Sequence, residues 1–381
     1  MVKRKLIIAA SLWIALTAAF TVRIQAQEKA WRAGIVTDEF IYEKAPYPQC
    51  HSATIAETPK GLVAAYFGGT RERNPDVCIY VSRNINGKWQ EPVNVANGIQ
   101  NDSLRYPTWN PVLYQVPGGE LLLFYKIGPK PSDWKGWLMR SKDAGATWSK
   151  PESLPEGFSG PIKNKPVLVG NELFCPSSTE GKGWNVHFEV TADNGKTWRK
   201  VGPIGKDSGI NAIQPSLLKY KKGKILQVLC RSMNRSVVES HSTDGGKTWT
   251  DLTPIGLPNN NSGTDAVTLR DGRQLIVYNH VKPADSLPRG KGARTPLNVA
   301  ISKDGKKWYA ALILEDSPIS QYSYPSVIQS ADGMVHFVYT WRREKIKYVK
   351  VDPSKLKLKR IKNEKWPGFI TKTTAASNEE E

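Results

Sequence analysis

The side chains of this chain that could do chemistry occur in short polar clusters between apolar, strand-like runs. At strand ends, their hydroxyl, amide and charged groups could bind the hydroxyls of a sugar. Each cluster alone is more often a turn than a ligand contact, but together they outnumber what turns require. Trp109 and Trp184 could stack on sugar rings, although a buried tryptophan is commoner. The clusters are residues 105–110, 163–165, 177–180, 261–265 and 278–280.

The chain is strongly basic, with a formal net charge of +19 over 381 residues. An excess of basic over acidic side chains attracts polyanions, although it can also serve solubility alone. The basic residues are scattered and no nucleic-acid-binding motif accompanies them, so we expect no nucleic-acid partner. An acidic oligosaccharide or polysaccharide is the polyanion we expect instead.

Residues 1–26 have the pattern of an export signal. Three basic residues at positions 3–5 precede an apolar stretch from Leu6 to about Phe20, and Ile24-Gln25-Ala26 offers a cleavage site. The apolar stretch is shorter than the ~20 residues that a membrane span needs, so cleavage is favoured over an uncleaved anchor. We therefore expect an exported protein of the periplasm, the cell surface or the medium, without stable membrane insertion.

The four cysteines, Cys50, Cys78, Cys175 and Cys230, lie far apart and form no CxxC pair. A zinc or redox site is therefore not expected, and the chemistry considered below needs no metal or other cofactor. A disulfide is possible in an exported protein, but Cys78 and Cys230 stand in apolar runs that suit buried thiols equally well. The sequence does not indicate an oligomeric state.

One short pattern recurs along the chain. Its Asp or Asn and its Gly predict a β-turn, and the tryptophan at its end predicts a large ring packed on the neighbouring strand. These tryptophans are 59, 50, 51 and 59 residues apart, a period typical of repeat architectures. The copies are residues 82–89, 141–148, 191–198, 242–249 and 302–308.

The spacing predicts an all-β fold, a six-bladed β-propeller. Paired strand signals with Gly turns fill the intervals between the copies, and four short strands per roughly 50 residues match one blade. We expect a single propeller domain over residues 34–353. Its last blade would be closed by an N-terminal strand near Ile35–Tyr42 beside Ile346–Val351, and residues 354–381 would form a loose C-terminal tail.

The recurring pattern S-x-D-x-G-x-x-W resembles the Asp-box of the sialidase superfamily, also known as the BNR repeat. The resemblance covers nearly all of the chain after residue 26, and it implies the sialidase-like propeller. It implies activity only weakly, since Asp-boxes also occur on binding propellers.

The resemblance also implies a set of site residues. Arg231 and Arg294 look like two members of the arginine triad that binds a substrate carboxylate, and Tyr322, in Gln-Tyr-Ser-Tyr-Pro, resembles the nucleophile, with Tyr324 as the alternative ring. Asp76 falls where the family places its acid, with Glu72 in the same loop as a rival. The further substrate-binding residues that we predict are Arg71, Glu72, Arg105 and Asp265.

Two positions depart from the family pattern. His51 stands where sialidases have the first arginine of the triad, and Gln214 stands where they have the glutamate beside the tyrosine. A glutamate can accept the phenol proton and a glutamine cannot, while a phenol near its usual pKa of ~10 is a poor nucleophile without that help. His51 could serve as a general acid or base near neutral pH, or it could be a hydrogen-bonded structural histidine.

Three functions stay open on this basis. The first is a sialidase-like, exo-acting glycoside hydrolase that removes an acidic or acid-linked terminal sugar, with Asp76 as acid and Tyr322 as nucleophile or stabilising group. The second is a lyase or dehydratase acting on a uronate, with His51 and Tyr322 as the proton-transfer groups. The third is a glycan-binding propeller without catalysis.

Overall fold

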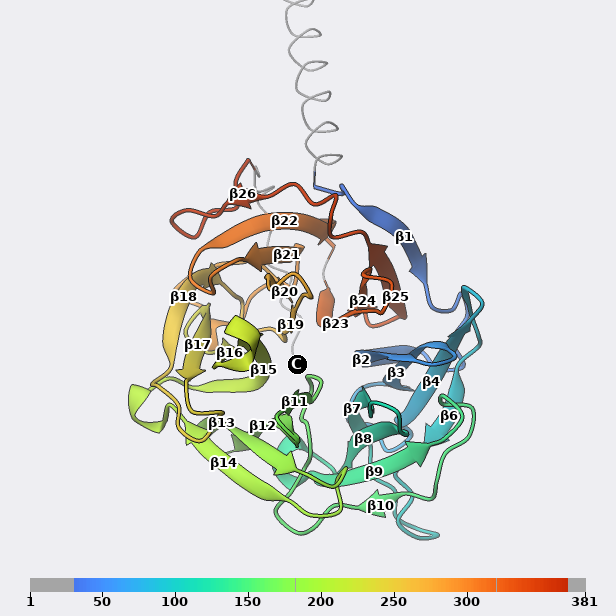
Figure 1. The fold of residues 1–381 in the computed structure, drawn as a ribbon. Coiled ribbons are helices and arrows are strands. Elements are labelled where there is room, and N and C mark those ends of the chain that lie inside the picture. The colour runs from blue at the N-terminus through green and yellow to red at the C-terminus, as the bar shows by residue number, and fades with distance from the viewer. Residues whose placement is uncertain (1–30, 182, 320, 369–381) are drawn as a thin grey trace, which may run out of the picture.

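Six antiparallel β-sheets surround a central axis in the computed structural model, which describes residues 31–181, 183–319 and 321–368 (Figure 1). The predicted six-bladed propeller is confirmed. Blade 1 holds β2 (Gln49–Thr58), β3 (Gly61–Gly69), β4 (Cys78–Ile85) and β5 (Lys88–Trp89), with β6 (Val93–Ala96) also on β4. Blade 2 holds β7 (Thr108–Gln115), β8 (Leu121–Ile127), β9 (Lys135–Ser141) and β10 (Glu152–Ser153). Blade 3 holds β11 (Val167–Val169), β12 (Glu172–Gly181), β13 (Gly183–Thr191) and β14 (Arg199–Ile204).

The second half of the ring repeats this order. Blade 4 holds β15 (Ala212–Tyr220), β16 (Ile225–Ser232), β17 (Ser236–Ser242) and β18 (Thr253–Pro258). Blade 5 holds β19 (Asp265–Thr268), β20 (Gln274–Tyr278), β21 (Leu297–Ser302), β22 (Trp308–Glu315) and β26 (Lys359–Arg360). Blade 6 holds β23 (Tyr322–Gln329), β24 (Val335–Trp341), β25 (Lys345–Val351) and β1 (Ile35–Phe40). The 3₁₀ turns are η1 (Pro131–Asp133), η2 (Lys206–Ser208), η3 (Lys221–Gly223) and η4 (Pro288–Gly290).

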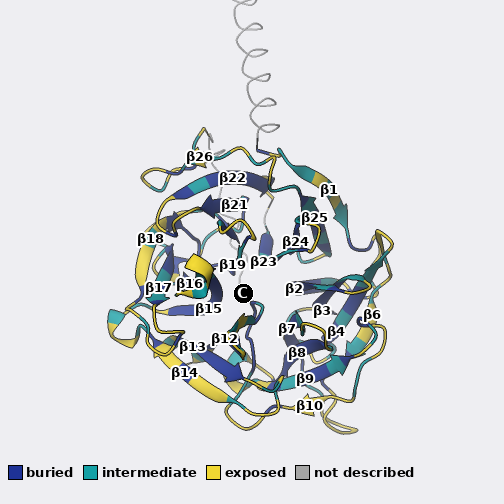
Figure 2. Cartoon of the chain, viewed as in Figure 1, coloured by how far each residue is buried: buried dark blue, intermediate teal, exposed yellow. Residues whose placement is uncertain are grey.

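The core lies between neighbouring blades, because each inner strand buries side chains on both of its faces. Strand β8, Leu-Leu-Leu-Phe-Tyr-Lys-Ile, is buried along its whole length. Its Leu121 and Leu123 pack against Val63 and Ala65 of blade 1. Figure 2 shows the burial decreasing outward, with exposed residues concentrated on the outer strands such as β14 and β18.

The repeated turns close the outer edge of the blades. In the copy between β9 and β10, the Asp143 carboxylate accepts from the Thr147 backbone N–H at 2.8 Å and from the Thr147 hydroxyl at 2.6 Å. The Ser141 hydroxyl accepts from the Gly145 N–H at 2.8 Å. These hydrogen bonds hold the pKa of Asp143 well below its usual range, so the carboxylate is a fixed acceptor that shapes the turn.

Blade 6 joins the two ends of the propeller. Strand β1 pairs antiparallel with β25, with Ile35 opposite Val351 and Phe40 opposite Lys347. This pairing confirms the predicted closure. Figure 1 shows β1 at the outer edge of the sheet that also contains β23, β24 and β25.

The segment after Pro353 corrects the prediction of a loose tail for its first part. Strand β26 pairs with β22, and Ile361 and Trp366 are buried. The Trp366 ring lies 5.4 Å from that of Trp31, so apolar contacts attach this segment to blade 5. Residues 369–381 and the predicted export signal, residues 1–26, lie outside the described residues.

The four cysteines are all buried and free. Among the residues that the structure describes, no helix is long and apolar enough to span a membrane.

Candidate functional site

The side chains that meet at the axis are positioned by bulges in the innermost strands. Strands β2, β7, β15 and β23 each shift register near their first residues. Each bulge contains a non-glycine residue with positive φ, a conformation that costs free energy and that clusters at functional sites. These residues are Ser52 (57°), Asn110 (37°), Gln214 (56°) and Tyr324 (50°).

The phenol of Tyr324 is the centre of the site. Its oxygen lies 3.1 Å from Gln214 Nε2 and 3.2 Å from Arg231 Nη1, and both of these groups donate to it. Because both neighbours are donors, the phenol's own proton points elsewhere. The hydroxyl can therefore donate to a third partner while its lone pairs are engaged.

The ring of His51 stacks on that of Tyr324, with centroids 4.2 Å apart and planes tilted by 46°. Its Nδ1 lies 2.9 Å from the hydroxyl of Thr340. Desolvation by burial, followed by the charges of Arg343 and Arg294, lowers the pKa of His51 well below its usual 6.5. The imidazole is therefore neutral at neutral pH, as a general base must be.

Positive charge surrounds this pair of rings. The guanidinium carbons of Arg231 and Arg294 lie 5.9 Å and 6.0 Å from the Tyr324 centroid. The predicted convergence of these two arginines is therefore present in the structure. Arg231 is only 7% exposed, and its Nε donates to Asn261 Oδ1 at 3.0 Å. Arg231 is buried and Arg294 half-buried, and two arginines at this separation suit a carboxylate or another planar anion.

A buried lysine also lies near the Tyr324 ring. Lys163 Nζ is 5.6 Å from the ring centroid and donates to the Pro325 carbonyl oxygen at 2.7 Å. Burial lowers the pKa of Lys163 to about 7. The backbone at Gly263 closes over the same group, since a Cβ there would lie 2.9 Å from Lys163 Cε and 3.2 Å from Tyr324 Cδ2.

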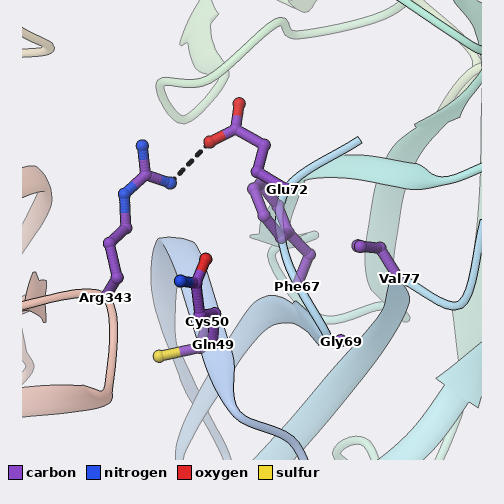
Figure 3. Close-up of a pocket in the computed structure, with 7 residues that line it drawn as sticks. All are labelled: Gln49, Cys50, Phe67, Gly69, Glu72, Val77 and Arg343. Carbon is purple, nitrogen blue, oxygen red and sulfur yellow. Dashed lines mark hydrogen bonds and ion pairs between the residues drawn. The ribbon is translucent and has the colours of Figure 1, made fainter. Parts of the chain in front are cut away.

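Two carboxylates border the site. Glu72, in the loop between β3 and β4, pairs with Arg343 at 2.5 Å (Figure 3). Glu180 lies 3.5 Å from Gln214 Nε2, and burial raises its pKa. Neither carboxylate has a hydrogen bond to the Tyr324 oxygen among those found in the described part of the chain.

Two of the predicted site residues have other surroundings. Tyr322 is 1% exposed and packs in the apolar core with Trp341, so the ring at the centre of the site is Tyr324. The bulge at Tyr324 explains why Tyr324 and not Tyr322 faces the site. The bulge breaks the regular alternation of side chains along β23. The Asp76 carboxylate accepts from the backbone N–H and hydroxyl of Thr70 at 2.8 and 2.7 Å, which closes its own loop.

The other predicted substrate-binding residues also differ in placement. Arg105 donates to the Asp76 carbonyl oxygen at 3.0 Å and anchors that loop, while Arg71 is exposed at its rim. Asp265 is fully buried, where its carboxylate accepts from Lys165 Nζ at 2.8 Å and from the Val327 N–H at 2.9 Å. These contacts connect blades 5 and 6 with the segment before β11. The role of Asp265 is therefore structural.

Sequence reasoning missed Arg343, Gln321 and Glu180 as individual site residues. Arg343 lies in a turn, where its sequence neighbours carry no strand or repeat pattern. A signal did exist for the bulges, since Asn110, Gln214 and Tyr324 each precede a proline inside an apolar strand. Among the described residues, no group of three or more His, Cys, Asp or Glu side chains could hold a metal ion.

Comparisons with known proteins agree with this architecture. Residues 60–337 match the family model of the BNR repeat-like domain. The anhydrosialidase of Macrobdella decora is 25% identical over 235 residues, which are 54% of this chain and 30% of the relative. The chain thus spans about a third of that relative's length.

Solved structures share the fold at low sequence identity. A protein of unknown function from Dyadobacter fermentans superposes with a TM-score of 0.68 at 17% identity, covering 84% of this chain and 99% of that one. The intramolecular trans-sialidase of Ruminococcus gnavus gives 0.65 at 14% identity, covering 84% and 98%.

The fold and the repeated turns define a sialidase-like six-bladed β-propeller. The chain belongs to the BNR repeat-like domain family.

Proposed function

We propose that this propeller is a carbohydrate-active enzyme that cleaves an acidic glycan by β-elimination next to a uronate carboxylate. The observation that carries the proposal is the Tyr324 hydroxyl, which faces an amide and a guanidinium where hydrolysis by a tyrosine nucleophile calls for a carboxylate. His51 stacked on the same ring supplies a second proton-transfer group.

Arginine binding of the carboxylate would prepare the substrate for elimination. The proton on the carbon next to a carboxylate is weakly acidic, and its removal places negative charge on the carboxylate oxygens. Arg231 and Arg294 lie within 6.0 Å of the Tyr324 ring, so they can stabilise this charge. Their N–H groups are already oriented before the substrate binds.

The two rings would then divide the proton transfers. Neutral His51 takes the proton from the carbon, and the electron pair of that C–H bond forms the new C=C bond. The C–O bond to the leaving sugar breaks, and its oxygen takes the Tyr324 proton. Water exchange returns the proton from His51 and restores the phenol.

Hydrolysis is the second candidate, favoured by Glu180. Burial raises the pKa of Glu180, which favours the protonated carboxylic acid that could donate to a leaving glycosidic oxygen. Tyr324 would then serve as nucleophile, and the anhydrosialidase relative would be the better guide to the reaction.

The test is incubation with oligosaccharides that contain a 4-O-glycosylated glucuronate and, in parallel, with sialic-acid-capped oligosaccharides. Elimination produces a conjugated unsaturated uronate, which is followed by its ultraviolet absorbance. Release of sugar without that absorbance indicates hydrolysis and overturns the elimination mechanism. Binding without release of sugar indicates a glycan-binding propeller.

A further inference from the structure

His51, which stands where sialidases have the first arginine of the triad, carries no charge. His51 is neutral at neutral pH because burial and nearby cations lower its pKa. A second arginine-bearing element nevertheless approaches the same place. The turn between β24 and β25 lies beside the start of β2, since the Cys50 N–H donates to the Arg343 carbonyl oxygen at 2.7 Å.

The side chain of Arg343 shares an acceptor with a site arginine. Its Nε donates to Gln321 Oε1 at 3.2 Å, and Arg294 Nη1 donates to the same oxygen at 3.2 Å. The guanidinium groups of Arg294, from blade 5, and Arg343, from blade 6, therefore meet at the Gln321 side chain. Arg343 is also the nearby charge with the largest effect on the pKa of His51.

The carboxylate of Glu72 already forms an ion pair with the Arg343 guanidinium. Glu72 Oε2 lies 2.5 Å from Arg343 Nη1, and the Glu72 side chain is 31% exposed (Figure 3). The pair bridges the β3–β4 loop of blade 1 and the last blade. The pair is only partly buried, and a substrate carboxylate in place of Glu72 would keep Arg343 paired with a negative charge, so the exchange costs little.

We propose that Arg343 is the third cation of the carboxylate site, and that a substrate carboxylate displaces Glu72 from it. This proposal rests on the proposed function, because it requires an acidic substrate at the axis. It adds a specificity element from the turn between β24 and β25, beside the start of β2. It also makes Glu72 a competitor that weakens binding of acidic glycans.

The experiment is a double-mutant cycle on binding. Calorimetry compares a glucuronate-terminated disaccharide with its methyl ester, which has the same shape without the charge. Arg343→Gln is expected to weaken binding of the acid about tenfold or more and to leave the ester nearly unchanged. Glu72→Gln is expected to strengthen binding of the acid severalfold, and only while Arg343 is present.

A matched control separates this effect from net charge. Arg342 is the neighbour in the same turn, but its guanidinium lies over the Trp341 ring at 4.3 Å. Arg342→Gln removes the same charge and is expected to leave both affinities unchanged. Equal weakening by the two arginine variants would mean a general electrostatic effect and would overturn the proposal.

The remaining outcomes are also distinguishable. If the wild-type protein does not prefer the acid to the ester, the proposed acidic substrate is wrong. If it does, but Arg343→Gln weakens both ligands equally, Arg343 does not bind the carboxylate. If Glu72→Gln weakens binding and lowers the melting temperature, the pair is a structural bridge and the displacement is wrong.

Discussion

At the scale of single residues, the phenolic oxygen of Tyr324 accepts two hydrogen bonds and keeps its proton for a third partner. Tyr322, two positions earlier, lies in the apolar core. The family resemblance pointed to the segment Gln-Tyr-Ser-Tyr-Pro, but it could not choose which of its two rings lies beside Arg231 and His51. That choice depends on a bulge, which is set by backbone geometry across two strands.

The two tyrosines therefore provide a direct comparison. Tyr324→Phe removes the proposed proton donor and is expected to lower kcat by about 10²–10⁴-fold. Tyr322→Phe, the matched control, removes a hydroxyl from the core and is expected to change kcat little. Steady-state kinetics on an oligosaccharide with a 4-O-glycosylated glucuronate measures both, and equal losses would contradict the assignment of Tyr324.

The pH profile reports on His51. Its lowered pKa means that the ring stays neutral as the pH falls through the usual 6.5, so a reaction that uses it as base stays active there. We expect the acidic limb of kcat/KM to lie below pH 6.5 and to disappear in the residual activity of His51→Gln. An acidic limb at or above pH 6.5 in the wild-type protein would contradict this role.

At the scale of elements, the repeated turns are structural units remote from the bulges that carry the site. Their period predicts the blades well, because each turn depends on local hydrogen bonds and one tryptophan. The site depends instead on where different blades meet. Arg343 illustrates the difference, since its contacts to Glu72 and Gln321 join residues that are far apart in the chain.

Removal of one turn carboxylate should therefore affect stability alone. Asp143→Ala deletes the acceptor of the Thr147 N–H and hydroxyl, and we expect a loss of about 1 kcal/mol in the free energy of unfolding. Urea denaturation measures this loss, with Asp251→Ala at an exposed position as control. The kcat is expected to stay unchanged, and a large fall would implicate the turn in catalysis.

At the scale of the whole molecule, buried histidines link stability to pH. Burial lowers the pKa of His336 and of His280 to about 4, whereas both rings titrate near 6.5 in the unfolded chain. Between pH 6.5 and 4 the unfolded chain therefore binds protons that the folded chain does not. The stability present above pH 6.5 is lost as the pH falls through this window.

The expected loss is up to about 3 kcal/mol for each histidine over the full window. Urea unfolding at pH 7 and pH 5 measures it. The His336→Asn variant is expected to show a smaller difference between the two pH values. An equal difference in the variant and the wild-type protein would show that His336 does not contribute.

The closure of the ring has a consequence for how the molecule is made. Strand β1 is synthesised among the first described residues, but its partner β25 is synthesised some 300 residues later, with Ile35 opposite Val351. Contacts of such long sequence separation form slowly. Blade 6 also contributes Tyr324 and Arg343, so a chain still on the ribosome has neither a complete ring nor a complete site. Activity should therefore appear only after blade 6 has been synthesised and has closed the ring.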